Sequence, residues 1–316
     1  MDKKNIVPIV FAFDNNLVLP ACVCLSSLMM SAKPDTFYDI FILYPESGVF
    51  RHEKIDRIPD FYPNCKIQYL AVNGTFAGAY EIRGITIPAY YRLLIPELIP
   101  QYDKILYSDV DVLFRRDLSE LLEWELGRDY LAAVYDWSIV IDENGQKYAR
   151  SQLHMHSNDY IQSGFLVINA RQMRDDGLVE RLKEVARKKY KFQDQDILNV
   201  VCVGRKRILP LWWNMTTYAF QYWNDRLDIM RGDYTVAEIE RQLTNSVLHY
   251  NGQKPWRGWC VNFDIWWEYY RRSPFFDEKF YFKFFYNKLN EHDQLSLWKR
   301  LKILLRYFVF GRKQCL

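Results

Sequence analysis

Two aspartates separated by one residue, Asp109 and Asp111, carry the clearest chemical signal in this sequence of 316 residues. They follow the apolar run KILYS, so strand alternation predicts both carboxylates on one side of a β-strand and Val110 on the other. Two carboxylates placed this closely repel each other unless a cation lies between them, and hard oxygen ligands suit Mg²⁺ or Mn²⁺. Two solvated acidic residues beyond a strand would give the same pattern, and the pattern alone favours that simpler interpretation.

A second segment, SVLHYNGQKPW at 246–256, offers groups that complement the aspartates. Its apolar run brings His249 to the end of a predicted strand, and imidazole is a ligand that Mn²⁺ accepts beside carboxylates. Gly252 permits close approach of the backbone to a ligand, and Lys254 is a compact cation suited to phosphate. A structural histidine followed by an ordinary turn is the alternative. Together with the aspartates, however, the segment predicts a site for a cation and a phosphate group.

The elements that must position these residues follow from the periodicity of the sequence. Short apolar runs rich in β-branched residues alternate with longer amphipathic runs, which predicts an α/β fold with a mostly parallel sheet and helices on both faces. Ligands bind such sheets at the carboxyl ends of the strands. Strands are predicted over 8–13, 39–44, 66–72, 103–114, 130–136 and 163–170. Helices are predicted over 17–32, 50–58, 88–99, 171–190, from 194 onward, and over 117–127, where Asp117 and Glu120 match a capping box.

Composition limits the class of protein. The apolar fraction of 49% and the charged fraction of 26% are those of a globular protein. No apolar run approaches the ~18 residues of a membrane-spanning helix. The first residues have a basic start but lack a small-residue cleavage site, so we expect no signal peptide. Six cysteines without a C-x-x-C pair indicate reduced thiols and a cytoplasmic protein.

Charge is distributed unevenly along the chain. The net charge of +3 combines +7 in residues 271–316 with −4 in the first 270 residues, which is not the footprint of a nucleic-acid-binding domain. Within 295–310, apolar residues recur at helical spacing beside basic residues: Leu297, Leu301, Leu304 and Phe308, flanked by Lys299, Arg300, Lys302 and Arg306. A basic amphipathic helix of this kind is typical of peripheral binding to an anionic membrane surface. A helix docked on the rest of the protein is the alternative.

Several segments, in this order over about residues 7–260, resemble glycosyltransferase family 8. These are the retaining GT-A enzymes that include lipopolysaccharide galactosyl- and glucosyltransferases and glycogenin. The matching segments are VPIVFAFDNN, PAYYRL, LYSDVDVLF, IQSGFLVINA, FQDQDILN and HYNGQKPW. The resemblance implies a Rossmann-like GT-A domain with a mostly parallel mixed sheet over 1–262 and a helical, aromatic and basic extension over 263–316.

The resemblance also implies an activity and its cofactors. It implies metal-dependent, retaining transfer of glucose or galactose from a UDP-sugar to a saccharide or glycolipid acceptor, with Mn²⁺ or Mg²⁺. Cell-surface glycan or lipopolysaccharide-type synthesis is the implied setting. The enzyme would act in the cytoplasm, bound peripherally to the inner face of the membrane through 295–310.

The residues that match the family's motifs take their roles from the resemblance. Metal binding falls to Asp109, Asp111 and His249. Binding of the UDP-sugar falls to Asp14, Asn16, Arg92, Asp109, Val110, Gln162, Ser163, Gly252 and Lys254, with Gly164 in the same turn. Asp194 and Gln195 match the catalytic positions beside the anomeric carbon. For these two, the alternative is an exposed helix N-terminus, where acidic residues favour the dipole.

Three positions depart from the family's pattern. Leu17 stands where the family often has an aromatic residue, which affects stacking on the uracil. Gln162 replaces a common asparagine, which would alter the choice of sugar. The loop from His249 to Lys254 is one residue shorter than H-x-x-G-x-x-K-P-W, which changes how the lysine reaches the β-phosphate.

Two other functions remain to be weighed. A sugar nucleotidyltransferase requires a glycine-rich, basic loop after the first strand, and FAFDNNLVLP has neither glycine nor lysine. A nucleotide-sugar-binding protein with little turnover is compatible with the shortened loop. For a transferase, the glycine-rich segment 74–87 is expected to close over the donor as a lid. One or two of Trp212, Trp213, Tyr218 and Trp256 are expected to contact a sugar ring.

Overall fold

The computed structural model describes residues 5–47, 49–81, 86–291 and 294–310, without the side chains of 224 and 306–310. Residues 82–85 of the predicted lid therefore lie outside the described part. So do the side chains of Arg306 and Phe308 in the predicted membrane helix.

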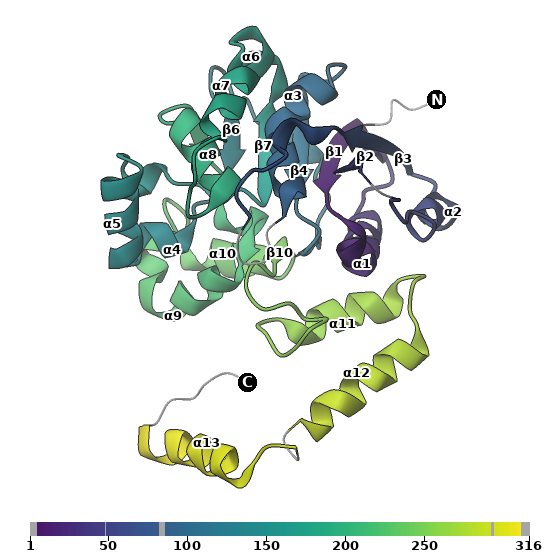
Figure 1. Ribbon diagram of the computed structural model, residues 1–316, viewed down its shortest axis with the longest axis vertical. Coiled ribbons are helices and arrows are strands. Elements are labelled where there is room, and N and C mark those ends of the chain that lie inside the picture. Colours follow the sequence, from purple (N-terminus) through teal and green to yellow (C-terminus); the bar gives the residue numbers. More distant parts are fainter. Residues whose placement is uncertain (1–4, 48, 82–85, 292–293, 311–316) are drawn as a thin grey trace.

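A seven-stranded sheet forms the centre of the molecule, with the strand order β3-β2-β1-β4-β7-β6-β8 (Figure 1). Its strands are β1 (Asn5–Ala12), β2 (Thr36–Pro45), β3 (Cys65–Val72), β4 (Lys104–Ser108), β6 (Leu131–Ala133), β7 (Phe165–Asn169) and β8 (Lys206–Ile208). All neighbours pair in parallel except at β7, which is antiparallel to both β4 and β6. The predicted mostly parallel mixed sheet is confirmed.

Both faces of this sheet are buried, because side chains alternate along each strand. In β1, Val7, Ile9 and Phe11 pack in one hydrophobic cluster, while Val10 packs in another on the opposite face. The first face is covered chiefly by α1 (Val18–Met30). The second is covered by η4 (Ile87–Leu94), α3 (Ile95–Leu98), α6 (Ala170–Asp175), α7 (Leu178–Val185) and α8 (Gln193–Val201).

A small second sheet continues from the carboxyl end of β4. It contains β5 (Val112–Leu113), β10 (Leu248–His249) and β9 (Met215–Thr216), in the order β5-β10-β9. His249 pairs with Val112 across the antiparallel ladder and with Thr216 across the parallel one. This sheet therefore brings residues from late in the chain to the end of β4.

The other elements surround these two sheets. The α-helices are α2 (Ile58–Phe61), α4 (Trp137–Val140), α5 (Glu143–Gln152), α9 (Thr217–Met230) and α10 (Val236–Leu243). The 3₁₀-helices are η1 (Asn15–Leu17), η2 (Ile55–Arg57), η3 (Gly74–Phe76), η5 (Ser119–Leu122), η6 (Ser157–Asp159) and η7 (Leu211–Trp213).

The last three helices of the described part are α11 (Phe263–Arg272), α12 (Glu278–Asn290) and α13 (Leu297–Phe310). α11 packs against α1 and buries Trp266 and Trp267. α12 rests on α11, with the ring centroids of Trp267 and Phe284 4.5 Å apart. Figure 1 shows α12 and α13 farther from the sheet, beyond α11. Among the described residues, no helix has the length and apolar character needed to cross a membrane.

The structure corrects two of the predicted elements near the paired aspartates. Residues 103–114 are not one strand, because the chain turns at Val110 and Asp111 between β4 and β5. Residues 117–127 are not an α-helix and form only η5. The Asp117 carboxylate accepts a hydrogen bond from Ser119 N (2.9 Å) at the start of η5, and it also accepts from Tyr38 Oη (3.1 Å) and Lys33 N (3.0 Å).

Three other predicted helices differ in their limits. The predicted helix over 171–190 is divided into α6 and α7 at Gly177, whose φ of +59° is a left-handed conformation that favours glycine. The predicted helix at 50–58 lies at 55–61 as η2 and α2. The predicted helix at 88–99 is 3₁₀ from Ile87 to Leu94, and α3 then restarts with Pro96 in its first turn.

Candidate functional site

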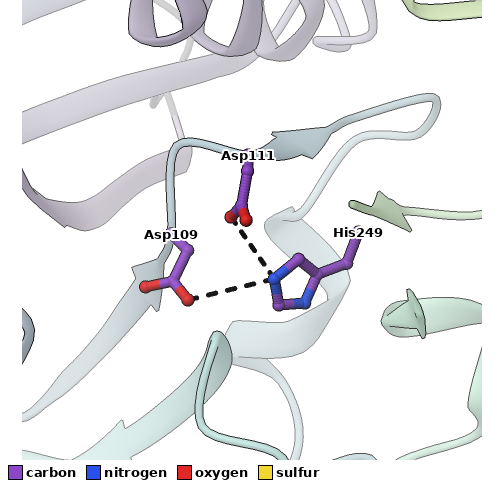
Figure 2. Close-up of side chains that lie close together, drawn as sticks. All are labelled: Asp109, Asp111 and His249. Carbon is purple, nitrogen blue, oxygen red and sulfur yellow. Dashed lines mark ion pairs between the residues drawn. The ribbon is translucent and has the colours of Figure 1, made fainter. Parts of the chain in front are cut away.

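The turn that carries Asp109 and Asp111 is held by backbone hydrogen bonds on both sides. Asp109 N donates to Gly164 O (2.8 Å) at the start of β7, and Tyr250 N donates to Asp111 O (2.9 Å) just after β10. The two carboxylates and the His249 imidazole point toward one another from these elements (Figure 2). A turn, rather than a continuous strand, is what brings both aspartates to the same point.

The three side chains have the geometry of a cation site. His249 Nε2 lies 3.3 Å from Asp111 Oδ1 and 3.9 Å from Asp109 Oδ2, and one ligand atom from each residue lies within 4.8 Å of the others. An octahedral divalent ion with bonds of about 2.1 Å places neighbouring ligands about 3 Å apart. The His249 side chain is 1% exposed and the carboxylates face it, so these residues fit a divalent cation.

Gly164 leaves the space in which His249 and Asp109 meet. A Cβ atom at this position would lie 2.3 Å from His249 Cε1 and 2.6 Å from Asp109 Oδ2. Both distances are far below the ~3.5 Å at which carbon atoms attract. Any side chain at Gly164 would therefore displace two of the three candidate ligands.

Lys254 approaches the same cluster from the loop after β10. Its Nζ forms an ion pair with Asp111 Oδ2 and donates to Tyr250 O (2.6 Å). Burial raises the pKa of Asp111, but Lys254 and His249 outweigh this effect and hold the pKa well below its usual range. Asp111 is therefore a carboxylate at neutral pH, and the shortened loop still brings the lysine to the site.

Arg92, from η4, connects the candidate cation site to a third carboxylate, that of Asp194. Its Nη2 donates to Asp109 Oδ1 (2.8 Å), its Nε pairs with Asp194 Oδ2 (3.1 Å), and its Nη1 donates to Ser163 O (2.6 Å). Tyr107 Oη also donates to Asp109 Oδ1 (2.7 Å). Because these donors hold Oδ1, Oδ2 is the oxygen that Asp109 turns toward His249.

Asp194 lies at the start of α8, where it is buried and not exposed as the alternative interpretation required. Only 4% of the residue is exposed. Burial raises the pKa of Asp194 to about 6. The positive charge of Arg92 lowers this pKa, but it does not outweigh desolvation together with the negative charge of Asp109. The group is thus a desolvated carboxylate paired with a guanidinium.

The amide of Gln195 is held at both ends. Its Oε1 accepts from Ser163 N (3.0 Å), and its Nε2 donates to Asp136 Oδ2 (2.9 Å) and to Tyr160 Oη (3.2 Å). These bonds hold the Gln195 side chain between the residues just before β7 and the segment that follows β6.

A pocket with a volume of about 250 Å³ opens at the carboxyl end of β1, the neighbour of β4. It is lined by Asp14, Asn15, Asn16, Pro45, Ser47, Val49 and Phe50. Asp14 caps η1 by accepting a hydrogen bond from Asn16 N (2.9 Å). Asn15 Nδ2 donates to Val49 O (2.7 Å), which connects η1 to the segment on the other side of the pocket. The pocket and the cation site thus lie at the same edge of the sheet, on adjacent strands.

Comparison with known proteins identifies the family. The sequence profile of Glycosyl transferase family 8 matches residues 8–260. The chain belongs to this family of glycosyltransferases. It is 23% identical to a lipopolysaccharide 1,2-glucosyltransferase of Escherichia coli over 268 residues, which cover 82% of this chain and 76% of that protein.

Solved structures agree with the family. The galactosyltransferase LgtC, in complex with donor and acceptor sugar analogs, has a TM-score of 0.70 and 28% identity, with coverage of 86% of this chain and 98% of LgtC. The bifunctional glycosyltransferase WbbM, in its apo form, has a TM-score of 0.68 and 26% identity. The match covers 92% of this chain but 52% of WbbM. The expected GT-A fold is confirmed.

The other residues of this family 8 protein that were predicted to bind the donor or a sugar ring differ in their burial and contacts. Val110 is buried in the core, so it offers a ligand only its backbone. Gln162 Oε1 accepts from Gly164 N (2.7 Å). Gly252 lies beside Thr217 at the start of α9, and a Cβ added at Gly252 would lie 3.6 Å from Thr217 Cγ2, an ordinary van der Waals contact. Trp212 and Trp213 are core residues, 7% and 1% exposed.

Sequence reasoning missed Asn214, which is fully buried and contacts both His249 and Gln162. It also missed Asp136 and Tyr160, the partners of Gln195. The signal for Asn214 was present, since it is a polar residue within the apolar run LPLWWNM. For Asp136 and Tyr160 no local pattern indicated this role, because their contacts arise where α8 packs on the segments that follow β6 and precede β7.

Proposed function

We propose that the protein is a retaining, metal-dependent hexosyltransferase that moves glucose or galactose from a UDP-sugar to a saccharide or glycolipid acceptor. The observation that carries the proposal is the convergence of Asp109, Asp111 and His249 in a family 8 chain, with Lys254 at one side and Arg92 at the other. We favour Mn²⁺ over Mg²⁺ as the ion, because an imidazole joins the carboxylates.

The basic groups of the site suit a departing nucleoside diphosphate. A bound divalent cation supplies charge neutralisation for the two phosphates as the sugar–phosphate bond breaks. Lys254 lies close enough to Asp111 to move between this carboxylate and a phosphate oxygen. Its charge would offset the negative charge that grows on the leaving group, where burial makes such an interaction strong.

Asp194 and Gln195 are proposed to face the anomeric carbon from the other side. Ionised Asp194 would favour the positive character that this carbon develops in the transition state. The Gln195 oxygen already accepts a hydrogen bond from Ser163 N, and an amide is a poor nucleophile. We therefore favour attack of the acceptor on the face from which the diphosphate departs, with a phosphate oxygen taking its proton.

The pocket at Asp14 and Asn16 is proposed to take the uridine. Asn16 is exposed to the pocket, and both residues offer groups that pair with a base or a ribose. Leu17 provides no aromatic ring, but Phe50 lines the same pocket and stacks on Tyr44 with centroids 4.9 Å apart. We propose Phe50 as the apolar wall against the base.

The test is release of UDP from UDP-glucose and UDP-galactose, with and without saccharide acceptors, in Mn²⁺, Mg²⁺ and EDTA. We expect release with one donor that an acceptor accelerates, that EDTA abolishes, and that Asp111→Asn abolishes without loss of the fold. Tight donor binding without acceptor-stimulated release would instead support the nucleotide-sugar-binding protein. Full activity in EDTA would remove the metal from the proposal.

We also propose that residues 263–316 form an extension to a catalytic domain over 1–262 and bring it to an anionic membrane surface. The described part of α12 and α13 exposes large apolar side chains: Phe282 (60%), Tyr286 (69%), Leu289 (74%), Leu297 (72%), Trp298 (81%), Leu301 (41%), Leu304 (51%) and Leu305 (58%). Lys299 and Lys302 are exposed among them. Apolar and basic residues on one surface helix favour binding at the lipid headgroup region.

Sedimentation with vesicles tests this surface. We expect the full chain to bind vesicles that contain anionic lipid, and the double variant Leu301→Asp/Leu304→Asp to lose most of that binding. Val203→Asp is the control, because Val203 is also exposed (52%) but lies on the body of the protein after α8. Equal sedimentation of the double variant and the control would contradict the membrane proposal.

A further inference from the structure

A chain of hydrogen bonds behind the cation site connects three separate parts of the sequence. Gly164 N and Asn214 Nδ2 both donate to Gln162 Oε1, at 2.7 and 2.6 Å. Asn214 Oδ1 in turn lies 3.0 Å from His249 Nδ1. Asn214 is fully buried, and Gln162 and His249 are 7% and 3% exposed, so water does not compete strongly for these contacts.

The direction of every bond in this chain follows from its first member. A backbone N–H can only donate, so the Gln162 atom that faces Gly164 N must be the amide oxygen. The Asn214 atom that faces the same oxygen must then be a donor, which is its NH₂ group. This leaves the Asn214 oxygen facing His249 Nδ1, and only a protonated Nδ1 can bond to it.

Protonation at Nδ1 determines what the other ring nitrogen can do. A neutral imidazole carries one proton, so Nε2 keeps its lone pair. Nε2 is the nitrogen that faces Asp109 Oδ2 and Asp111 Oδ1. The lone pair is therefore directed to the point where the carboxylates converge, as cation binding requires.

We propose that Asn214 is a positioning residue that, with Gln162, holds His249 in the Nδ1-protonated form and directs Nε2 to a divalent cation. Groups behind a metal-binding histidine usually contribute 10–100-fold to metal affinity by fixing its tautomer and orientation. Asn214 immediately precedes β9, and His249 ends β10, the strand paired with β9. The small sheet thus supplies both the ligand and the group that orients it.

This inference rests on the proposed cation site, but its first test needs neither a metal nor activity. Metal-free, full-length protein with ¹⁵N-labelled histidine is examined by long-range ¹H–¹⁵N correlation at alkaline pH, where imidazoles are neutral. The chain has five histidines, and the signals of His249 are those lost in His249→Asn. We expect a protonated Nδ1 and an unprotonated Nε2, and a proton on Nε2 would overturn the inference.

The second test measures Mn²⁺ affinity by electron paramagnetic resonance. Asn214→Leu fills nearly the same space without donor or acceptor, and we expect affinity about 10–100-fold weaker than in the wild type. Asn214→Asp keeps an acceptor for Nδ1 but loses the NH₂ group that donates to Gln162 Oε1, so we expect it to recover only part of the affinity while keeping the Nδ1-protonated signal. A purely structural role for Asn214 would give no such recovery.

The matched control is Asn169→Leu. Asn169 is likewise an asparagine whose NH₂ group donates hydrogen bonds, to Gly127 O (3.2 Å) and Asp129 O (3.0 Å), but it lies at the end of β7 opposite to Gly164. We expect its Mn²⁺ affinity to equal that of the wild type. Wild-type affinity in folded Asn214→Leu would refute the positioning role, whereas absence of Mn²⁺ binding in the wild type would refute the proposed cation site itself. The wild-type spectrum decides the tautomer even if the Asn214 variants do not fold.

Discussion

Replacing Gly164 by alanine should damage the cation site through a single methyl group. The added Cβ would stand 2.3 Å from His249 Cε1 and 2.6 Å from Asp109 Oδ2. Ordinary contacts lie near 3.5 Å, so relief of the two overlaps requires a shift of about 1 Å in each of the two ligands. Metal sites tolerate only about ±0.2 Å in their bond lengths. The backbone cannot easily yield instead, because Gly164 is bonded to Asp109 N and Gln162 Oε1.

The expected size of the effect can be worked out for thermal or urea unfolding with Mn²⁺. An ion present at 100 times the wild-type Kd adds about 2.7 kcal/mol to the free energy of unfolding. If Gly164→Ala weakens binding 100-fold, the same concentration adds only about 0.4 kcal/mol. Overpacking should also lower the stability of the metal-free variant by about 1–3 kcal/mol.

The control for this variant is Gly252→Ala, in the loop after His249. Its added Cβ would lie 3.6 Å from Thr217, an ordinary contact, so we expect Mn²⁺ to stabilise this variant as much as the wild type. Unfolding of metal-free and Mn²⁺-saturated protein gives both quantities for each variant. If Gly164→Ala gained as much stability from Mn²⁺ as Gly252→Ala, the assignment of the cation to this cluster would be refuted.

Three other variants test the charged groups. Lys254→Met should weaken UDP binding in the presence of Mn²⁺ by tenfold or more, without lowering Mn²⁺ affinity in the absence of nucleotide; calorimetric titration separates the two, and unchanged UDP affinity would contradict the phosphate role. Arg92→Met should cost about 3–5 kcal/mol in urea unfolding, because it removes the guanidinium paired with the buried carboxylate of Asp194 and also an ion-pair partner of the partly buried Asp109; a loss below 1 kcal/mol would contradict this. Transfer should fall as the pH drops through about 6, where Asp194 takes up a proton. Burial raises the pKa of Asp194 above its ordinary 3.8, so between about pH 4 and 6 the folded state binds this proton more tightly than the unfolded state does. The free energy of unfolding should therefore fall, relative to Asp194→Asn, as the pH rises from about 4 to 6. Parallel pH profiles for the two proteins would contradict the assignment.

The sequence predicted the first strands of the sheet well, because β1, β2 and β3 are short segments that consist mostly of apolar and aromatic residues. It failed where tertiary contacts replaced local ones. Asp117 has the sequence context of a helix cap and does accept from Ser119 N, yet it also binds Tyr38 and Lys33 N, and only a short 3₁₀-helix follows. The run 103–114 is apolar enough for one strand, but its polar residues Asp109 and Asp111 turn the chain between two sheets.

The cation cluster itself was accessible from sequence, because Asp109, Asp111 and His249 stand in recognisable motifs. Their supporting groups were not. Asn214 orients the histidine and Asp136 holds Gln195, yet neither lies within twenty residues of its partner along the chain. Such contacts depend on which strands become neighbours. Periodicity along a single strand carries no information about that choice.

The small sheet has a consequence for local opening. β10 contains two residues, and it holds the imidazole against a turn from the middle of the chain. Local opening of this short strand would move His249 away from the aspartates, so a cation bound to all three residues would favour the closed strand. Occupancy should therefore slow amide hydrogen exchange in β5, β9 and β10 far more than in the seven-stranded sheet, because the ion would cross-link strands that pair over only two residues each.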